Sequence, residues 1–391
     1  MSVNTMSFEQ AATLLNAVHS QVTGMNTIAP TDVSDFISVA QKTLQAGYDP
    51  VINAISQVVG KTIFSIRPYD AKFAGIQADA QKWGAITRKL AVADKPFEDN
   101  EALNLVDGAA IDMYEVNKPN VVQFNFYGAL EYSKSFTIFR SQLDSAFRGP
   151  EEFGRFMAMV LQNAMDMITQ SKETCARLAI GNFIAGKIDA SADIIHLLTE
   201  YNTETGASPA YTATTIKDPA NFPAFIKWVY ARIATLTNMM TERSALYQIQ
   251  VTGSELMRHT PFENQKVYLL NWLLNNIDAR VLADTYNYKF LQLADVEAVN
   301  YWQAIDTPDE IDILPTYLKT DGTLKVASSA VNQTGVMGVI FDDEAIGYTL
   351  MNEFTGVTPM NVRGEYWNQY FNYIIRYWND FTEKGIVLLL D

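Results

Sequence analysis

The sequence is poor in the side chains that most catalytic and metal sites use. Its 391 residues include one cysteine, Cys175, and three histidines, His19, His196 and His259, which lie far apart along the chain. A single cysteine excludes an intrachain disulfide and a zinc site built from cysteines. The sequence also contains no metalloprotease, P-loop or dinucleotide-binding motif. We therefore expect no metal, no cofactor and no enzymatic activity, and the scarcity favours a structural protein.

Basic residues and long apolar runs are also scarce. Lys and Arg total 29 against 44 Asp and Glu, which gives a formal net charge of −15 and a pI of about 4.7. So acidic a chain lacks the basic face with which proteins bind nucleic acids. No apolar run approaches the roughly 18 residues of a transmembrane helix, and residues 1–23 lack the features of a signal peptide. We expect synthesis and folding in a reducing cytoplasm.

The composition is nevertheless that of a folded protein. Apolar residues make up 48% and aromatic residues 12%, far above the content of a disordered acidic chain. The length allows one large domain or two to three smaller ones. Cys175 lies in an apolar row at helical spacing, which is typical of a core residue.

Carboxylates gather at two points that read as turns. These are Asp342, Asp343 and Glu344 in one, and Asp309, Glu310 and Asp312 in the other. Such groups could bind a divalent cation or act as an acid and base pair. Without a second motif, carboxylates in turns are usually solvated, so we take solvation as the better interpretation. A soluble enzyme that uses paired carboxylates remains an alternative.

Short helices are predicted at the N-terminal end. Residues 7–23, 31–47 and 50–59 each combine a cap or an initial proline with a narrow apolar stripe, and a glycine follows each stretch or closes it. Two interpretations stay open, an ordinary N-terminal subdomain and an arm that packs on neighbouring subunits. The composition favours the subdomain.

The segment 70–112 has no sustained helical or alternating pattern. A loop of about forty residues is uncommon in a compact domain unless it is functional or makes intermolecular contacts. The segment therefore predicts a hairpin arm that reaches another subunit, or a lid. It contains several glycines, the single aromatic residues Phe73, Trp83 and Phe97, and most of the local basic residues. These basic residues are Lys72, Lys82, Arg88, Lys89 and Lys95.

The strongest local signal is a helix that begins at Pro150 and runs to about residue 186. Pro150 stands at the entry, Glu151 and Glu152 follow at the positive end of the helix dipole, and apolar residues recur every three to four positions. Gly186 and Lys187 predict its end. About 36 residues correspond to roughly 54 Å, several times the usual helix length. So long a helix favours a thin, extended molecule.

Strands and helices alternate over much of the remaining chain. Aromatic residues dominate the segment 366–378, which we expect to form one long strand. The predicted strands are 121–139, 247–251, 288–293, 334–341, 348–350, 366–378 and 386–390, and the predicted helices are 221–240 and 267–282.

This order of elements resembles the major capsid proteins of tailed phages with the Hong Kong 97 fold. The chain is most similar to the capsid proteins of phi-29-like short-tailed phages, whose closing strands resemble residues 341–343, 362–364 and 366–371 here. The resemblance implies an α+β fold of five parts. These are an N-arm (1–60), an extended loop (61–118), a peripheral domain (119–200) with a spine helix (150–186), an axial domain (201–345) and closing strands (346–391).

The resemblance also implies a function. The protein would assemble with itself as hexamers and pentamers into an icosahedral shell around double-stranded DNA, without sequence-specific binding and without a membrane, and with scaffolding and portal proteins as further partners. An encapsulin-type compartment is the nearest alternative, and a portal or scaffold is another. The expected intersubunit contacts are Phe73, Trp83 and Phe97 as anchors of the extended loop, Arg88 and Lys89 as partners of acidic groups on a neighbour, and Phe8, Leu14 and Val18 as docking residues of the N-arm.

Overall fold

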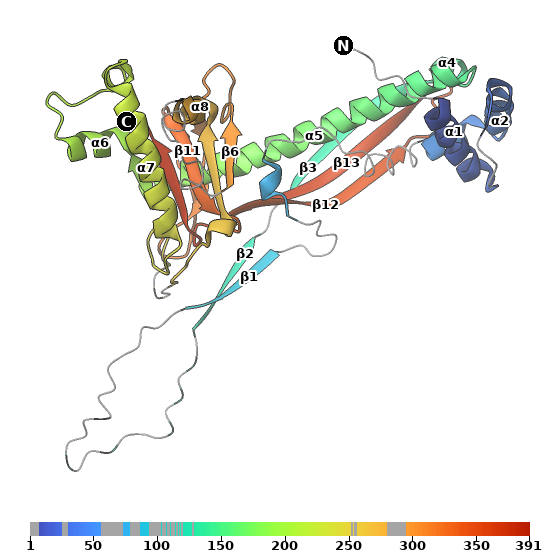
Figure 1. Cartoon of the computed structure of the whole chain (residues 1–391). Coiled ribbons are helices and arrows are strands. Elements are labelled where there is room, and N and C mark those ends of the chain that lie inside the picture. Colours follow the sequence, from blue (N-terminus) through green and yellow to red (C-terminus); the bar gives the residue numbers. More distant parts are fainter. Residues whose placement is uncertain are drawn as a thin grey trace.

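The chain forms an elongated molecule in which one long helix connects two lobes and a narrow ribbon projects from the body (Figure 1). Among the described helices, none is long and apolar enough to cross a membrane. The computed structural model describes residues 8–25, 30–55, 73–78, 87–93, 121–126, 129–251, 253, 256–279 and 295–391, with scattered residues between 101 and 120.

The long helix, α5, spans Pro150–Asp189 and contains 40 residues. Pro150 occupies its first turn with Glu151 and Glu152, as the sequence predicts. The helix continues through Gly186, where the sequence places a stop. A Cβ at Gly186 would lie 2.7 Å from the Phe381 ring, so this glycine permits close packing and does not end the helix.

A three-stranded antiparallel sheet in the order β12-β13-β3 runs along α5. Its strands are β3 (Leu130–Phe139), β12 (Ile346–Val357) and β13 (Tyr366–Asn379). The aromatic strand predicted over 366–378 is therefore confirmed. Trp367 and Phe371 of β13 are buried, whereas Tyr370 on the opposite face is 37% exposed. The alternation turns one face of the sheet toward the core.

A mixed five-stranded sheet in the order β4-β14-β11-β5-β6 forms the core of the second lobe. The apolar run 267–270, predicted as the start of a helix over 267–282, belongs to β5, and the helix that follows spans only 271–277. Apolar runs buried on both faces do not distinguish strand from helix. The strand predicted over 288–293 lies outside the described residues. The sheet comprises β4 (Ile194–His196), β5 (Gln265–Leu270), β6 (Asp295–Val299), β11 (Val336–Asp342) and β14 (Gly385–Leu389).

The N-terminal helices pack within the chain, at the end of the molecule where α5 begins. They are α1 (Phe8–Thr23), α2 (Val33–Gln45) and a helical segment over residues 48–55. The ring of Phe36 lies 5.8 Å from the ring of Phe153 of α5. These helices therefore share one buried cluster with the start of α5 in the same chain.

Smaller elements complete the described fold. They are β1 (Thr87–Val92), β2 (Val121–Phe126), β7 (Ile311–Ile313), β8 (Thr316–Leu318), β9 (Leu324–Val326), β10 (Val331–Gln333), α4 (Arg140–Ala146), α6 (Leu197–Thr205), α7 (Phe222–Met240), α8 (Asn271–Ile277) and the 3-10 turns η1 (Ala74–Ile76), η3 (Thr215–Lys217) and η4 (Phe262–Asn264).

Candidate intersubunit arm and its junction with the body

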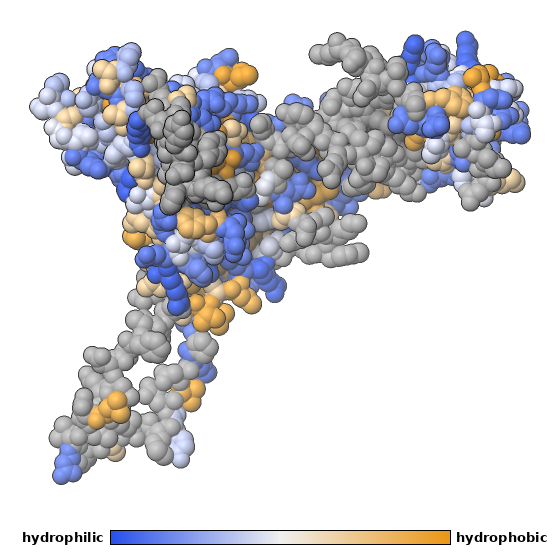
Figure 2. Space-filling view, viewed as in Figure 1, coloured by the Kyte–Doolittle hydropathy of each residue, from blue (hydrophilic) through white to orange (hydrophobic). Residues whose placement is uncertain are grey.

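Strands β1 and β2 pair into an antiparallel ribbon that leaves the body of the molecule (Figure 1). The register places Val92 opposite Val121 at the outer end of the pair. On one face Leu90, Val92 and Val121 are 67%, 61% and 55% exposed. Figure 2 shows apolar side chains at the surface where the ribbon meets the body. Exposed apolar patches of this kind mark interaction surfaces.

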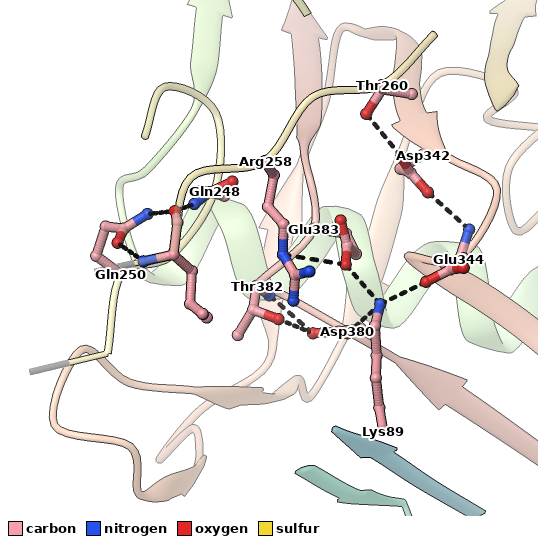
Figure 3. A network of polar contacts seen from close by, with 11 residues as sticks. Lys89, Gln248, Gln250, Arg258, Thr260, Asp342, Glu344, Asp380, Thr382 and Glu383 are labelled. Atoms are coloured by element: carbon pink, nitrogen blue, oxygen red, sulfur yellow. Dashed lines mark hydrogen bonds and ion pairs between the residues drawn. The ribbon is translucent and has the colours of Figure 1, made fainter. Parts of the chain in front are cut away.

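Lys89 lies on the opposite face of β1 and connects the ribbon to the body (Figure 3). Its Nζ lies 2.5 Å from Glu383 Oε1, 2.8 Å from Glu344 Oε2 and 3.0 Å from Asp380 Oδ2. The side chains of Asp380 and Glu383 are only 2% and 6% exposed. Arg258 Nε approaches the same Glu383 oxygen at 3.3 Å. One ammonium group thus binds three carboxylates at the junction.

Two turns position these carboxylates. Asp380 and Glu383 lie between β13 and β14, where the backbone N–H and hydroxyl of Thr382 donate to Asp380 Oδ1 at 2.9 and 2.5 Å. Glu344 lies between β11 and β12, and its backbone N–H donates to Asp342 Oδ1 at 2.9 Å. Local hydrogen bonds therefore fix both turns independently of the lysine.

The electrostatics follow from burial combined with pairing. Burial lowers the pKa of Lys89, but the carboxylates of Asp380 and Glu383 outweigh that effect and the pKa is raised overall. Burial raises the pKa of Glu383, and Lys89 and Arg258 offset part of the rise. Burial and the neighbouring Asp342 raise the pKa of Asp343 to about 6. Lys89 is therefore a fixed positive charge among carboxylates that prefer to stay paired.

A comparison with family models identifies the chain. The model described as "Phi29-like phage major capsid protein" matches residues 12–381. The chain belongs to this family. The capsid protein forms the shell of the phage head by assembly of its subunits, and it is a component of the virion. The match favours a head shell over the encapsulin, portal and scaffold alternatives.

Solved structures confirm the fold of the capsid protein. One is titled as the capsid structure of Staphylococcus phage Andhra, with a TM-score of 0.56, 11% identity, and coverage of 83% of this chain and 86% of that chain. Another, titled for the head fiber and inner core protein gp22 of native bacteriophage P68, has a TM-score of 0.53 at the same identity and coverage. The comparison with curated proteins gives no match. The α+β fold of Hong Kong 97 type is therefore confirmed.

The capsid protein places the predicted contact residues in different surroundings. Arg88 is exposed on the outer face of the ribbon, whereas the carboxylate partners of Lys89 all belong to its own chain. Phe73 is 2% exposed, with its ring 5.4 Å from the ring of Tyr268. Phe73 thus lies in the core of its own subunit.

The remaining predicted residues divide into two groups. Val18 is fully buried among the N-terminal helices, and Phe8 and Leu14 pack against the same cluster. Trp83 and Phe97 lie outside the described residues. Contact of all these side chains with a neighbouring subunit stays a prediction.

The cysteine and the acidic residues discussed from the sequence are also part of the described structure. Cys175 is fully buried, and burial raises its thiol pKa to about 12, so the thiol is a core group. In the part of the chain that the structure describes, no group of His, Cys, Asp and Glu is arranged to hold a metal ion. Sequence reasoning singled out Glu344 but missed Asp380 and Glu383. Their signal is a pair of carboxylates in a short turn between two strongly apolar strands.

Proposed function

We propose that this capsid protein builds an icosahedral head from hexamers and pentamers around double-stranded DNA, and that the β1–β2 ribbon is an arm that contacts a neighbouring subunit. The observation that carries the proposal is the exposed apolar face of the ribbon. Leu90, Val92 and Val121 are each more than half exposed on an element that projects from the body. A partner that covers this face would remove apolar surface from water, which is favourable.

Charge supports the same role for the arm. Arg88 lies on the exposed face of the ribbon, in a chain whose net charge is −15. We propose that carboxylates of a neighbouring subunit pair with this guanidinium group. The pairing would add orientation more than affinity, since rim charges chiefly fix register.

We propose a division into parts that follows the arrangement in Figure 1. The helices of residues 8–55 support a separate N-terminal part, and α5 with its three-stranded sheet supports a peripheral part. The five-stranded sheet supports an axial part. The proposed boundaries remain 1–60, 61–118, 119–200, 201–345 and 346–391, with the return strand of the arm, β2, just beyond the second.

We further propose that the shell contacts DNA without binding it, that scaffolding and portal proteins take part in assembly in the host cytoplasm, and that the protein has no catalytic role. The net charge of −15 supports the weak contact with DNA, because like charges repel. A lumen surface dominated by Lys and Arg would contradict this part of the proposal.

Deletion of the arm tests the central claim. Removal of residues 70–112 is expected to abolish shells, and it also destabilises the subunit, because it removes Phe73 from the core and Lys89 from its buried carboxylates. A second variant, in which a short Gly-Ser turn replaces residues 95–119, keeps both ribbon strands and Lys89. Negative-stain microscopy and light scattering measure shells, and circular dichroism measures folding. Closed particles from both variants would overturn the proposal.

A further inference from the structure

We infer that Lys89 is the positioning residue of the arm: its three carboxylate contacts set the direction in which the β1–β2 ribbon leaves the subunit. The inference rests on the proposed function only in that a fixed direction matters for reaching a neighbour. The direction itself is a property of the single subunit and can be measured there.

The first argument is where the three carboxylates come from. Glu344 lies in the turn that joins β11 to β12, and Asp380 and Glu383 lie in the turn that joins β13 to β14. Strands β11 and β14 belong to the five-stranded sheet, whereas β12 and β13 belong to the three-stranded sheet. Lys89 therefore contacts both turns through which the chain passes from one sheet to the other. Contacts to two separate turns define a direction, which a single contact would not.

The second argument is the space beside the ribbon. A cavity of about 510 Å³ lies at the junction and is lined by Val92 of the ribbon together with Met257, Arg258 and Glu383 of the body. Interiors are normally close-packed, and such packing by itself fixes the position of an element. Next to this open space, polar contacts carry more of the orientation. Lys89 supplies three ion pairs to the body (Figure 3).

The third argument is the burial of the partners. Asp380 and Glu383 are almost fully buried, so a displaced Lys89 would leave them desolvated and without their cation. Buried ion pairs contribute little net stability, but separating them is costly. The energy therefore rises steeply when the ribbon turns away. The hydrogen bond from Arg376 Nη1 to Thr87 Oγ1, at 3.3 Å, constrains the first residue of the strand more weakly, because its acceptor is an uncharged hydroxyl.

Distances between spin labels test the inference in unassembled subunits. Gln123 is exposed on the ribbon and Ala224 is exposed on α7, so Gln123→Cys with Ala224→Cys provides two labelling sites. The native Cys175 is fully buried and stays unlabelled. Pulsed electron paramagnetic resonance of the otherwise unchanged chain is expected to give one narrow distribution. Lys89→Met is expected to shift and broaden it.

Two further variants make the result decisive. Arg88→Met removes a charge one residue away on the opposite face and is expected to leave the distribution unchanged. The combination Lys89→Met with Asp380→Asn removes the lysine together with one buried carboxylate and leaves Glu383 paired with Arg258. It is expected to keep the fold if Lys89→Met alone unfolds, and to broaden the distribution likewise. A distribution identical to that of the parent in this combination overturns the inference. A moved arm with normal shells would instead count against the proposed role of the arm.

Discussion

The ammonium group of Lys187 lies 2.5 Å from the carboxylate of Asp193, and the lysine side chain is completely buried. Burial lowers the pKa of Lys187, and Asp193 opposes that effect. We expect Asp193→Asn to lower the free energy of unfolding by about 3 kcal/mol at pH 7, because a buried charge loses its partner. Asparagine tolerates the positive φ of 58° at this position.

The loss in Asp193→Asn should depend on pH. A lysine whose folded pKa is below its unfolded value costs stability while it is charged, and the cost disappears as the pH rises through the folded pKa toward 10.5. Urea unfolding at pH 7 and pH 10 measures the difference. The control is Asp189→Asn, whose pair with Lys325 is part-exposed and should contribute much less to stability. Equal losses at both pH values would contradict the prediction.

Asp343 should make the subunit more stable in mild acid. Its pKa is raised from 3.8 to about 6, so the folded state binds the proton more tightly than the unfolded state. The ionised carboxylate therefore destabilises the fold, increasingly from pH 4 to pH 6 and fully above that. Asp343→Asn is expected to raise the melting temperature at pH 8 and to leave it unchanged near pH 4. The gain in unfolding free energy should stay under about 1 kcal/mol, because more than a third of the residue is open to water, which screens the charge.

Thermal unfolding at the two pH values checks this expectation. Asp312→Asn, on β7 in the other acidic cluster, alters an exposed carboxylate in the same way and serves as the comparison. An increase for Asp343→Asn that is the same at pH 4 and pH 8 would show that the carboxylate charge is not its cause.

Gly347 of β12 should not accept a side chain. A Cβ at this position would lie 2.2 Å from the ring of Trp378 on the paired strand. Gly347→Ala is therefore expected to cost about 1–3 kcal/mol of unfolding free energy. Gly356→Ala on the same strand is the control, because its nearest contact is the Phe354 ring, which is 62% exposed and can move aside. Comparable losses in both variants would refute the steric explanation.

The apolar face of the ribbon should matter for assembly and not for folding. Leu90→Ser with Val92→Ser is expected to change the unfolding free energy of the subunit by less than about 0.5 kcal/mol, since both side chains are already exposed. The yield of particles, measured by light scattering, should fall. Leu324→Ser with Val326→Ser is the control, because it changes an equally exposed apolar pair on β9, away from the ribbon. Undiminished assembly of the Leu90 and Val92 variant would contradict the prediction.

The sequence predicts the elements whose periodicity is long and uninterrupted. The helix from Pro150 and the aromatic strand from Tyr366 both stand out because each keeps one pattern for more than three turns or ten residues. The residues Val267–Leu270 show the limit, since four buried apolar residues carry no period. The sequence predicts a strand of three residues at 348–350, whereas β12 spans twelve residues. Its backbone pairs with β13 almost throughout, and a local sequence pattern does not reveal that pairing.

The arm junction lies beyond what local patterns can predict. Lys89 and Glu383 are separated by 294 positions, and the folded chain alone brings them together. Gly186 likewise has a role that depends on Phe381, far along the sequence. The sequence does indicate an unusual segment around Lys89, because its mixture of glycine, aromatic and basic residues fits no regular element.

The two side-by-side passages between the sheets have a mechanical consequence. β11 continues into β12 and β13 continues into β14 after short turns, so covalent backbone joins the two lobes twice on one side of α5. A force that pulls the lobes apart along the long axis is thus resisted by peptide bonds and by the hydrogen bonds between antiparallel strands loaded in shear. Tension in a shell built from such subunits would separate the contacts between subunits before it stretches the subunit itself.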